Sequence, residues 1–426
     1  MSIVELIDKV RQTTAISDDL FAIIVIEATA FPRIHARFGY RRAGQLLDSL
    51  RSRFQQALRP VDEIVQTGDQ TFVAIIRQLK NPGHAILAGK KFLRICEPEG
   101  LPLLNKHAPL QGHAGIALYP AHGVDPADLL QQAQIALEVA KESGKDLVTA
   151  DDDSVRYLKD GWEMRDELAH AVRDSDLELH YQPKIDLQTN EICGVEALMR
   201  WFSPTWGQVP PARFFAVAEG TDLLAPMTRY ALNAALRCAV LWRRDGNDIG
   251  IAVNLPASLL LDAELVDMIR SLLSIWNIPA SLLTLEITES SIMTDVEASF
   301  ATMNRLKELG ARISIDDFGT GFSSFSYFQS IPADELKIDR TFVTGMVTNP
   351  ADRHLVETML NLAHRFGMTV VAEGIEDEAT LTALRDAGCD VGQGFHIARP
   401  MPQVKFDAWL DARIMEQLVA QQDDHP

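Results

Sequence analysis

The C-terminal part of the chain repeats one unit, a short β-branched strand that ends in a polar cluster and is followed by a helical pattern. Seven such strands are expected, at residues 192–201, 249–256, 282–290, 312–321, 335–340, 369–376 and 391–398. Amphipathic patterns such as 297–310 and 353–367 fill the gaps between them. Strand and helix alternation of this kind over roughly 260 residues predicts a (β/α) barrel of the TIM type.

The ends of these strands carry the polar residues of interest. In such a barrel the carboxyl ends of the strands meet on one face. The residues expected there are Glu196, Asn254, Glu286, Asp316, Asp317, Lys337, Glu373 and Gln393. Carboxylate and amide oxygens without histidine or cysteine match Mg²⁺ or Mn²⁺ rather than zinc.

Two adjacent aspartates, Asp316 and Asp317, raise a separate question, because like charges repel unless a cation lies between them. They suit a two-metal site, in which the ions lie about 3.5–4 Å apart. Taken alone, the segment "DDFGTG" also fits a solvated turn with a capping aspartate. The repetition of polar strand ends favours the metal site. His354, His364 and His396 lack metal-binding spacing and are expected to be surface or core residues.

The first part of the chain has a different order of patterns. Strands are expected at 21–28, 63–69, 71–77 and 113–120, and helices at 43–58, 84–96 and 126–144. This order predicts an α/β sandwich. An acidic run at 144–162 interrupts the apolar periodicity, so we predict domains at 1–150 and 162–420 with a linker at 151–161.

Composition excludes some classes of function. The formal net charge of −19 disfavours a protein that follows a nucleic-acid backbone. No apolar run approaches the ~20 residues that span a bilayer, and no basic and apolar leader opens the chain, so a cytoplasmic protein without a membrane segment is expected. The four cysteines, Cys96, Cys193, Cys238 and Cys389, are scattered and are expected to be reduced, buried and inert.

Between residues 162 and 402 the chain resembles the EAL domain, a bacterial cyclic di-GMP phosphodiesterase. The motifs are, in family order, "YQPKIDLQTNEICGVEALMRW", "VNLPAS", "LEITES", "SIDDFGTGFSSFSYF", "DELKIDR", "VVAEGIE" and "GQGFHIARP". The resemblance implies a TIM-like barrel with one antiparallel strand, and hydrolysis of cyclic di-GMP to linear pGpG with two Mg²⁺ or Mn²⁺ ions. The phenylalanine in "QGF", where the family usually has tyrosine, removes no metal ligand.

The same resemblance assigns roles to individual residues. One metal falls to Glu196, Asn254, Glu286 and Asp316, and the other to Asp316 and Asp317. Lys337 is expected to contact the attacking water and the phosphate, Glu373 to bind a metal or its water, and Gln393 to orient the nucleophile. Arg200 is expected on a substrate phosphate and Gln182 near a guanine. Glu289, Asp339 and Glu376 are expected behind the metal ligands.

The segment after Asp317 matches a mobile loop near a barrel–barrel dimer surface in the family. It carries Phe322, Phe325, Tyr327 and Phe328. We therefore expect a homodimer whose interface sets the order of this loop and, through Glu289, the metal-binding strand ends. The alternative is a rigid loop that covers apolar surface.

Residues 18–148 resemble a GGDEF domain, the diguanylate cyclase fold, but the signature loop departs from the family. Gly68–Phe72 reads "GDQTF", so the catalytic acidic pair becomes Gln70 and Thr71. Upstream, where the family has two metal-binding aspartates, this chain has one acidic residue, Glu27, in place of the first. His35 and Gln45 stand at the positions of guanine-contacting residues. A cyclase needs paired carboxylates to hold Mg²⁺ and the triphosphate, so this domain is expected to be silent and regulatory, with GTP as a candidate ligand.

Arg59 and Asp62 match the position of the product-inhibition site of cyclases, although the same residues also fit an ordinary turn.

Two alternatives to the phosphodiesterase stay open. One is a cyclic di-GMP receptor that does not hydrolyse the nucleotide and signals to a protein partner. The other is an unrelated metal-dependent barrel hydrolase.

Overall fold

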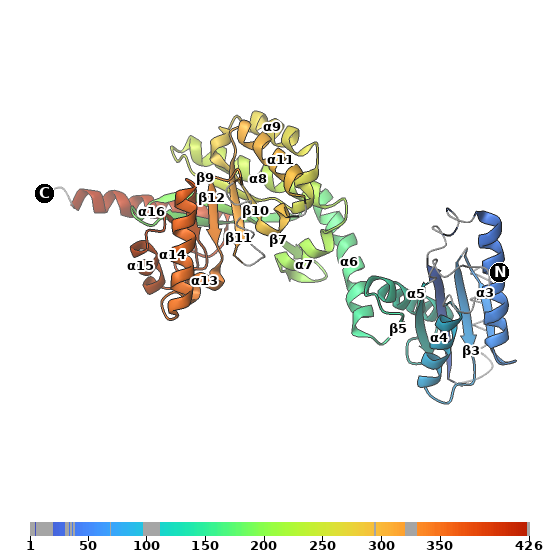
Figure 1. Ribbon diagram of the computed structural model, residues 1–426. Coiled ribbons are helices and arrows are strands. Elements are labelled where there is room, and N and C mark those ends of the chain that lie inside the picture. The colour runs from blue at the N-terminus through green and yellow to red at the C-terminus, as the bar shows by residue number, and fades with distance from the viewer. Residues whose placement is uncertain are drawn as a thin grey trace. The chain divides into compact units, whose positions relative to one another are not determined.

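The structure is a computed structural model that describes Glu5 and residues 20–29, 34, 36, 39–68, 70–96, 111–293, 295–319 and 330–423. The chain divides into two units, Met1–Glu163 and Met164–Pro426, which are described separately (Figure 1). Helix α6 (Asp153–Asp174) contains the division and most of the stretch expected as a linker. No helix among these residues is long and apolar enough to cross a membrane.

The N-terminal unit is built on one five-stranded sheet with the order β2–β3–β1–β4–β5. Its elements are β1 (Phe21–Thr29), α3 (Tyr40–Ala57), β2 (Glu63–Gln66), β3 (Thr71–Ile76), α4 (Gly83–Cys96), β4 (Gln111–Tyr119), α5 (Pro126–Glu142) and β5 (Leu147–Thr149). Strand β1 pairs antiparallel with β3 and β4, and only β5 runs parallel to its neighbour β4. The expected strands and helices are all present, and β5 is an additional strand among the described residues.

The alternation of side chains along β1 explains the layers of this unit. Ile24 and Ile26 pack in one apolar cluster with Phe54 of α3 and Phe92 of α4. Ile23 and its neighbours of the same parity pack in a second cluster with α5. Successive side chains of a strand point to opposite faces, so helices cover both faces of the sheet, and the predicted α/β sandwich is confirmed.

The C-terminal unit is a closed barrel surrounded by helices (Figure 1). Its strands are β6 (Leu177–Asp186), β7 (Ile192–Ser203), β8 (Gly207–Val209), β9 (Gly250–Asn254), β10 (Leu283–Thr288), β11 (Arg312–Phe318), β12 (Glu335–Ile338), β13 (Thr369–Ala372), β14 (Val391–Gly392) and β15 (Met401–Pro402). Its α-helices after α6 are α7 (Pro211–Ala218), α8 (Leu224–Arg244), α9 (Leu265–Trp276), α10 (Glu289–Ile292), α11 (Val296–Glu308), α13 (Arg340–Gly345), α14 (Pro350–Arg365), α15 (Glu378–Asp386) and α16 (Gln403–Asp423). Two 3₁₀ helices, Ala257–Leu261 and Ala280–Leu282, complete it.

The order of the strands around the barrel is β6–β14–β13–β12–β11–β10–β9–β7, and β7 pairs back to β6. All neighbours run parallel except β6, which is antiparallel to both β7 and β14. The predicted TIM-like barrel with one antiparallel strand is therefore confirmed. The strand count from the repeated pattern is incomplete, because β6 closes the barrel and is not among the seven expected strands.

Strand β10 shows how the barrel separates its core from its site. Leu285 and Ile287 lie in the main apolar cluster together with Met303 and Leu306 of α11. Residues of the other parity, Glu286 among them, point toward the barrel axis.

Three of the four cysteines are buried as expected, but Cys193 is exposed, and the prediction for that residue is wrong. It lies at a register shift between β6 and β7, where the regular alternation of side chains is broken.

Candidate active site

The adjacent aspartates lie at an irregularity of strand β11. The pairing of β11 with β12 shifts register between Ile315 and Phe318, and Asp317 has a φ of 54°. In a regular strand the two side chains would point to opposite faces, whereas a bulge redirects one of them. Asp316 and Asp317 consequently line the same cavity. Aspartate tolerates this left-handed backbone conformation better than most residues.

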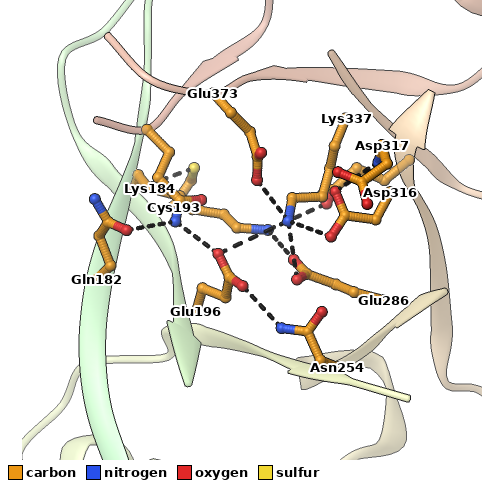
Figure 2. Close-up of polar contacts among 12 residues, drawn as sticks. Gln182, Lys184, Cys193, Glu196, Asn254, Glu286, Asp316, Asp317, Lys337 and Glu373 are labelled. Atoms are coloured by element: carbon orange, nitrogen blue, oxygen red, sulfur yellow. Dashed lines mark hydrogen bonds and ion pairs between the residues drawn. The ribbon is translucent and has the colours of Figure 1, made fainter. Parts of the chain in front are cut away.

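Lys337, which points inward from β12, lies at the centre of the carboxylates (Figure 2). Its ammonium nitrogen Nζ lies 2.6 Å from Glu373 Oε1 and 3.0 Å from Glu286 Oε2. It also lies 3.2 Å from Asp316 Oδ2 and 3.7 Å from Glu196 Oε2. The strand ends of β7, β10, β11 and β13 thus meet at one buried cation.

Amide side chains hold Glu196 from the other side. The amide of Asn254 donates to Glu196 Oε1 at 2.9 Å, and that of Gln393 donates to Glu196 Oε2 at 2.7 Å. Gln393 also donates to Gln182 Oε1 at 3.0 Å, and Gln182 donates in turn to the carbonyl of Ala398. The buried Oε1 of Gln393 has no hydrogen-bond partner in the described part of the chain. This chain of amides links the antiparallel strand β6 to the carboxylate cluster.

Two residues of the barrel interior, Lys184 and Glu335, and the exposed Cys193 near them were not predicted as part of the site. Lys184 on β6 places its Nζ 2.7 Å from Glu286 Oε1 and 3.3 Å from Glu335 Oε1. Cys193, on the neighbouring strand, donates its thiol hydrogen to the carbonyl of Lys184 (Figure 2). The sequence did indicate two of them, because side chains two residues apart on a strand point to the same face. Lys184 lies two residues from Gln182, and Glu335 lies two residues from Lys337.

Burial and crowding of charge shift the pKa values of these groups. Burial raises the pKa of Glu286, but the ammonium groups of Lys184 and Lys337 outweigh it and lower that pKa to about 2. Burial and the charge of Glu286 raise the pKa of Glu196 to about 7 despite Lys337. Burial raises the pKa of Glu373, and burial together with Asp316 raises that of Asp317. The two lysines do not compensate all of the negative charge.

An excess of oxygen ligands and negative charge is what a divalent cation requires. Among the described residues, no group of three or more acidic, histidine or cysteine side chains is already arranged to hold a metal ion. Lys337 lies where the carboxylates converge instead. The chemistry of the residues therefore fits Mg²⁺ or Mn²⁺, and binding would require the Lys337 ammonium to move from its present place.

Four of the carboxylates, Glu196, Asp316, Asp317 and Glu373, line a cavity of about 1190 Å³, whereas Glu286 does not. Ligand pockets of about 300–1,000 Å³ are usual, so this cavity has room for a large ligand. The cavity lining also includes Arg200, whose Nη1 donates to the carbonyl of Met199 at 2.8 Å. Phe395, which is half exposed, and Glu376 also line it. Arg200 thus supplies a cation to the same cavity as the carboxylates.

Glu289 and Asp339, expected behind the metal ligands, do not line the cavity. Glu289 opens α10 after β10, and its Oε2 accepts a hydrogen bond from the backbone N–H of Gly319 at 3.2 Å. Asp339 caps α13 by accepting from the Thr341 N–H at 2.9 Å. Glu289 therefore joins the end of β10 to the segment that follows Asp317. The predicted aromatic loop itself, Phe322 to Phe328, lies outside the described residues.

The corresponding positions of the N-terminal unit hold fewer charges, and its Lys141 pairs with both Glu27 and Glu138. Glu27 on β1 forms an ion pair with Lys141 of α5, with Nζ 3.2 Å from Oε1. Thr71, at a position of the lost acidic pair, lies opposite Glu27 in the β1–β3 pairing, and the carbonyl of Gln70 accepts from the Ala28 N–H. Gln45 is exposed, and His35 lies outside the described residues.

Arg59 and Asp62 form a closed turn. The guanidinium of Arg59 donates to Asp62 through Nε and Nη2, both at 2.8 Å, and Nη2 also donates to the carbonyl of Arg77. Asp62 accepts in addition from the backbone N–H of Arg77. These contacts match the turn alternative, and a nucleotide site here stays a prediction. His364 and His396 form exposed pairs with Asp390 and Glu378.

Comparison with known families agrees with this geometry. The model of the EAL domain matches residues 165–400. The chain belongs to the EAL domain family. A diguanylate cyclase GGDEF domain model matches residues 4–147, so the EAL domain follows a GGDEF domain in this chain.

Two proteins of Pseudomonas aeruginosa are among the relatives. The bifunctional diguanylate cyclase/cyclic di-GMP phosphodiesterase MucR is 35% identical over 391 residues, which are 91% of this chain and 57% of the relative. The cyclic di-GMP phosphodiesterase NbdA is 32% identical over 394 residues, 92% of this chain and 50% of the relative. The chain thus spans about half the length of these curated relatives.

Two solved structures are similar to the C-terminal unit or to more of the chain. The PaMucR phosphodiesterase in its c-di-GMP complex is 40% identical, with a TM-score of 0.55, and covers 57% of this chain and 99% of its own. The EAL enzyme Bd1971 in its cAMP and cyclic-di-GMP bound form is 26% identical, with a TM-score of 0.58, and covers 71% of this chain and 82% of its own.

Proposed function

We propose that this chain is a metal-dependent phosphodiesterase that hydrolyses cyclic di-GMP to linear pGpG. The observation that supports this most is the convergence of Glu196, Glu286, Asp316 and Glu373 on Lys337 in an EAL domain, beside a large cavity that all but Glu286 line. Arg200, which lines the same cavity, suits a substrate phosphate, because charge-assisted hydrogen bonds bind phosphate oxygens well. The names and ligands of the similar proteins agree with this substrate.

The ligands proposed for two Mg²⁺ or Mn²⁺ ions are Glu196, Asn254, Glu286 and Asp316 for one, and Asp316 and Asp317 for the other, with Glu373 on a metal or its water. When bound, such ions polarise a phosphodiester and lower the pKa of water enough to give hydroxide near neutral pH. Lys337, displaced from the carboxylates, would donate to a phosphate oxygen. Gln393, fixed by Glu196 and Gln182, would orient the attacking water, and Gln182 lies close enough to the cavity to contact a guanine.

We further propose that the GGDEF domain makes no cyclic di-GMP and regulates the EAL domain. A cyclase must hold Mg²⁺ and a triphosphate with paired carboxylates, and here Gln70 and Thr71 replace them while Lys141 neutralises Glu27. GTP remains a candidate ligand of this domain. The contact of Glu289 with Gly319 supports a link between the metal-binding strand ends and the following loop, and a homodimer through the barrel is the proposed means of setting that loop.

The test of the phosphodiesterase is to incubate the purified protein with Mg²⁺ and cyclic di-GMP and to separate the nucleotides by chromatography. Linear pGpG should appear, and its formation should stop in EDTA and resume when Mg²⁺ is restored. Cyclic di-GMP that binds but stays intact in Mg²⁺ and in Mn²⁺ would support the receptor alternative instead.

The test of the silent GGDEF domain uses the full chain with Glu196→Ala, so that any cyclic di-GMP formed from GTP is not hydrolysed. No cyclic di-GMP should accumulate with Mg²⁺ and GTP. Its accumulation would show that the altered signature loop retains cyclase activity.

A further inference from the structure

Lys184 is a buried cation that the proposed reaction does not use. It extends from β6, the one antiparallel strand, across the barrel interior to β10 and β12 (Figure 2). Its side chain is 6% exposed, and those of its partners Glu286 and Glu335 are 0% and 8% exposed. A buried ammonium is costly unless charged partners hold it in good geometry. Both partners are within ion-pair distance here.

Glu286 receives one lysine on each of its oxygens. Lys184 donates to Oε1 at 2.7 Å, and Lys337 donates to Oε2 at 3.0 Å. The two lysines differ in their other contacts. Lys337 contacts three further carboxylates that line the cavity or its edge, whereas Lys184 contacts only Glu335 besides Glu286 in the part of the chain that the structure describes.

Glu335 completes this arrangement from below the site. It opens β12 two residues before Lys337, so both side chains point into the barrel, with Glu335 one layer deeper. Glu335 holds the Lys184 ammonium between β12 and β10. Lys184, Glu335 and Glu286 do not line the cavity, but Glu286 contacts Lys337, which does. The pair can therefore act on a ligand only through Glu286.

We propose that Lys184 is a positioning residue that holds Oε1 of Glu286, so that only Oε2 is available to a divalent cation once Lys337 has moved away. Glu286 would then bind the cation through one oxygen, in an orientation fixed from the opposite wall of the barrel. Glu335 serves as the second anchor of Lys184. The inference rests on the proposed metal-dependent function, and it assigns the antiparallel strand β6 a part in metal binding.

The test is direct binding of Mn²⁺ to the full chain, measured without substrate by electron paramagnetic resonance of the free ion. Partners that orient a metal ligand typically affect metal affinity about 10–100-fold. Lys184→Met should therefore raise the Mn²⁺ dissociation constant about tenfold or more. Lys307→Met is the matched control, because Lys307 forms an ion pair of 2.7 Å with Asp334 and does not line the cavity. It should leave Mn²⁺ binding unchanged.

Lys184→Met leaves two buried carboxylates with one cation fewer and can fail to fold for that reason alone. The double variant Lys184→Met, Glu335→Leu removes a balanced pair, so it should fold and should still bind Mn²⁺ about tenfold more weakly than wild type. A merely structural role predicts the opposite, namely lower thermal stability with unchanged Mn²⁺ affinity. Wild-type affinity in the folded variants, or a double variant that does not fold, would overturn the proposal.

The same measurement separates this inference from the proposed function. If the wild-type protein binds no Mn²⁺ and produces no pGpG, the metal-dependent function itself is wrong. If the wild type does both, and the Lys184 variants bind Mn²⁺ equally well, only the positioning role is wrong.

Discussion

Glu27 of the GGDEF domain and Glu286 of the EAL domain are both glutamates on a central strand, and both contact a lysine. Glu27 has a single ion pair, with Lys141 at 3.2 Å, beside positions where the family's acidic residues are absent. Glu286 has two lysines, at 2.7 and 3.0 Å, and lies among further carboxylates that share Lys337. Lys141 is shared with Glu138, so the first site has two carboxylates on one lysine, all partly exposed, whereas the second has a larger and buried excess of carboxylates.

This difference is the one we expect between a domain without catalytic activity and a candidate catalytic site. A buried excess of carboxylates destabilises a fold unless it has a cation to hold, so its presence in the barrel requires a compensating function. At the site of Glu27 in the GGDEF domain the side chains are partly exposed, so water screens their charges and the fold has no such requirement. The number of carboxylates and their burial, rather than the mere presence of acidic residues, distinguish the two sites.

The largest expected effect on turnover comes from removing the negative charge of one carboxylate in the barrel. Glu196→Gln keeps the size of the side chain but removes its negative charge, so pGpG production should fall about a hundredfold or more. Chromatography of the nucleotides measures it. The exposed Glu308 at the end of α11 provides the control, and Glu308→Gln should leave turnover unchanged. Equal turnover in both variants would remove Glu196 from the site.

The same variant has a predicted effect on stability. The pKa of Glu196 is raised in the fold to about 7, so its ionised form destabilises the metal-free protein above the unfolded pKa, and increasingly so up to about pH 7. Glu196→Gln should therefore unfold at the same temperature as wild type, or higher, in EDTA at pH 8. A clearly lower unfolding temperature would show that the carboxylate stabilises the fold.

The next effect concerns the identity of the ion. Ca²⁺ makes longer and less regular bonds than Mg²⁺, and the carboxylates of this site lie close together around Lys337. Replacing Mg²⁺ with Ca²⁺ should lower turnover by about tenfold or more. Titration of Ca²⁺ into the Mg²⁺-loaded enzyme should inhibit it in competition with Mg²⁺. Full activity in Ca²⁺ alone would contradict the compact two-metal site.

Most of the candidate site was predicted from the sequence, by assuming that polar residues at the carboxyl ends of barrel strands lie together. Glu196, Asn254, Glu286 and Lys337 meet because parallel strands of a barrel bring their carboxyl ends to one face. This assumption does not apply to β6, which runs the other way, so Lys184 was missed although its side chain enters the same interior.

Two other features of the site depend on three-dimensional geometry that cannot be read from the amino-acid sequence. The position of Lys337 at the centre of the carboxylates follows from the depth at which each strand enters the barrel. The shared cavity wall of Asp316 and Asp317 follows from a register shift and a positive φ. Neighbouring aspartates in a sequence give no indication of such a bulge. Conversely, the lost acidic pair at Gln70 and Thr71 was evident from the sequence alone.

A separate effect is expected on stability when the central cation is removed. Lys337→Met leaves Glu286, Asp316 and Glu373 close together without their shared ammonium, and loss of one partner of a buried ion pair costs about 3–5 kcal/mol. Denaturant unfolding in EDTA measures the loss. Added Mg²⁺ should restore part of it, because the ion replaces the missing positive charge. Unchanged stability in EDTA would mean that the carboxylates do not depend on Lys337.

The smallest effect is expected at the partly exposed site of Glu27 in the GGDEF domain, and it tests the comparison most directly. Glu27→Gln breaks the ion pair with Lys141, whose side chain is 30% exposed and also pairs with Glu138 at 3.1 Å. Partly exposed pairs contribute about 0–1 kcal/mol, so the free energy of unfolding should fall by about 1 kcal/mol or less. Turnover and Mn²⁺ binding should not change, because the excess of charge lies in the other domain.

The matched variant in the barrel is Glu286→Gln, measured in the same denaturant and Mn²⁺ titrations. It should abolish Mn²⁺ binding at concentrations that saturate both wild type and Glu27→Gln. If Glu27→Gln weakens Mn²⁺ binding as much as Glu286→Gln does, the GGDEF domain holds a metal ion as well. Glu27 and Glu286 would then both be metal ligands, and an excess of negative charge would no longer distinguish the two domains.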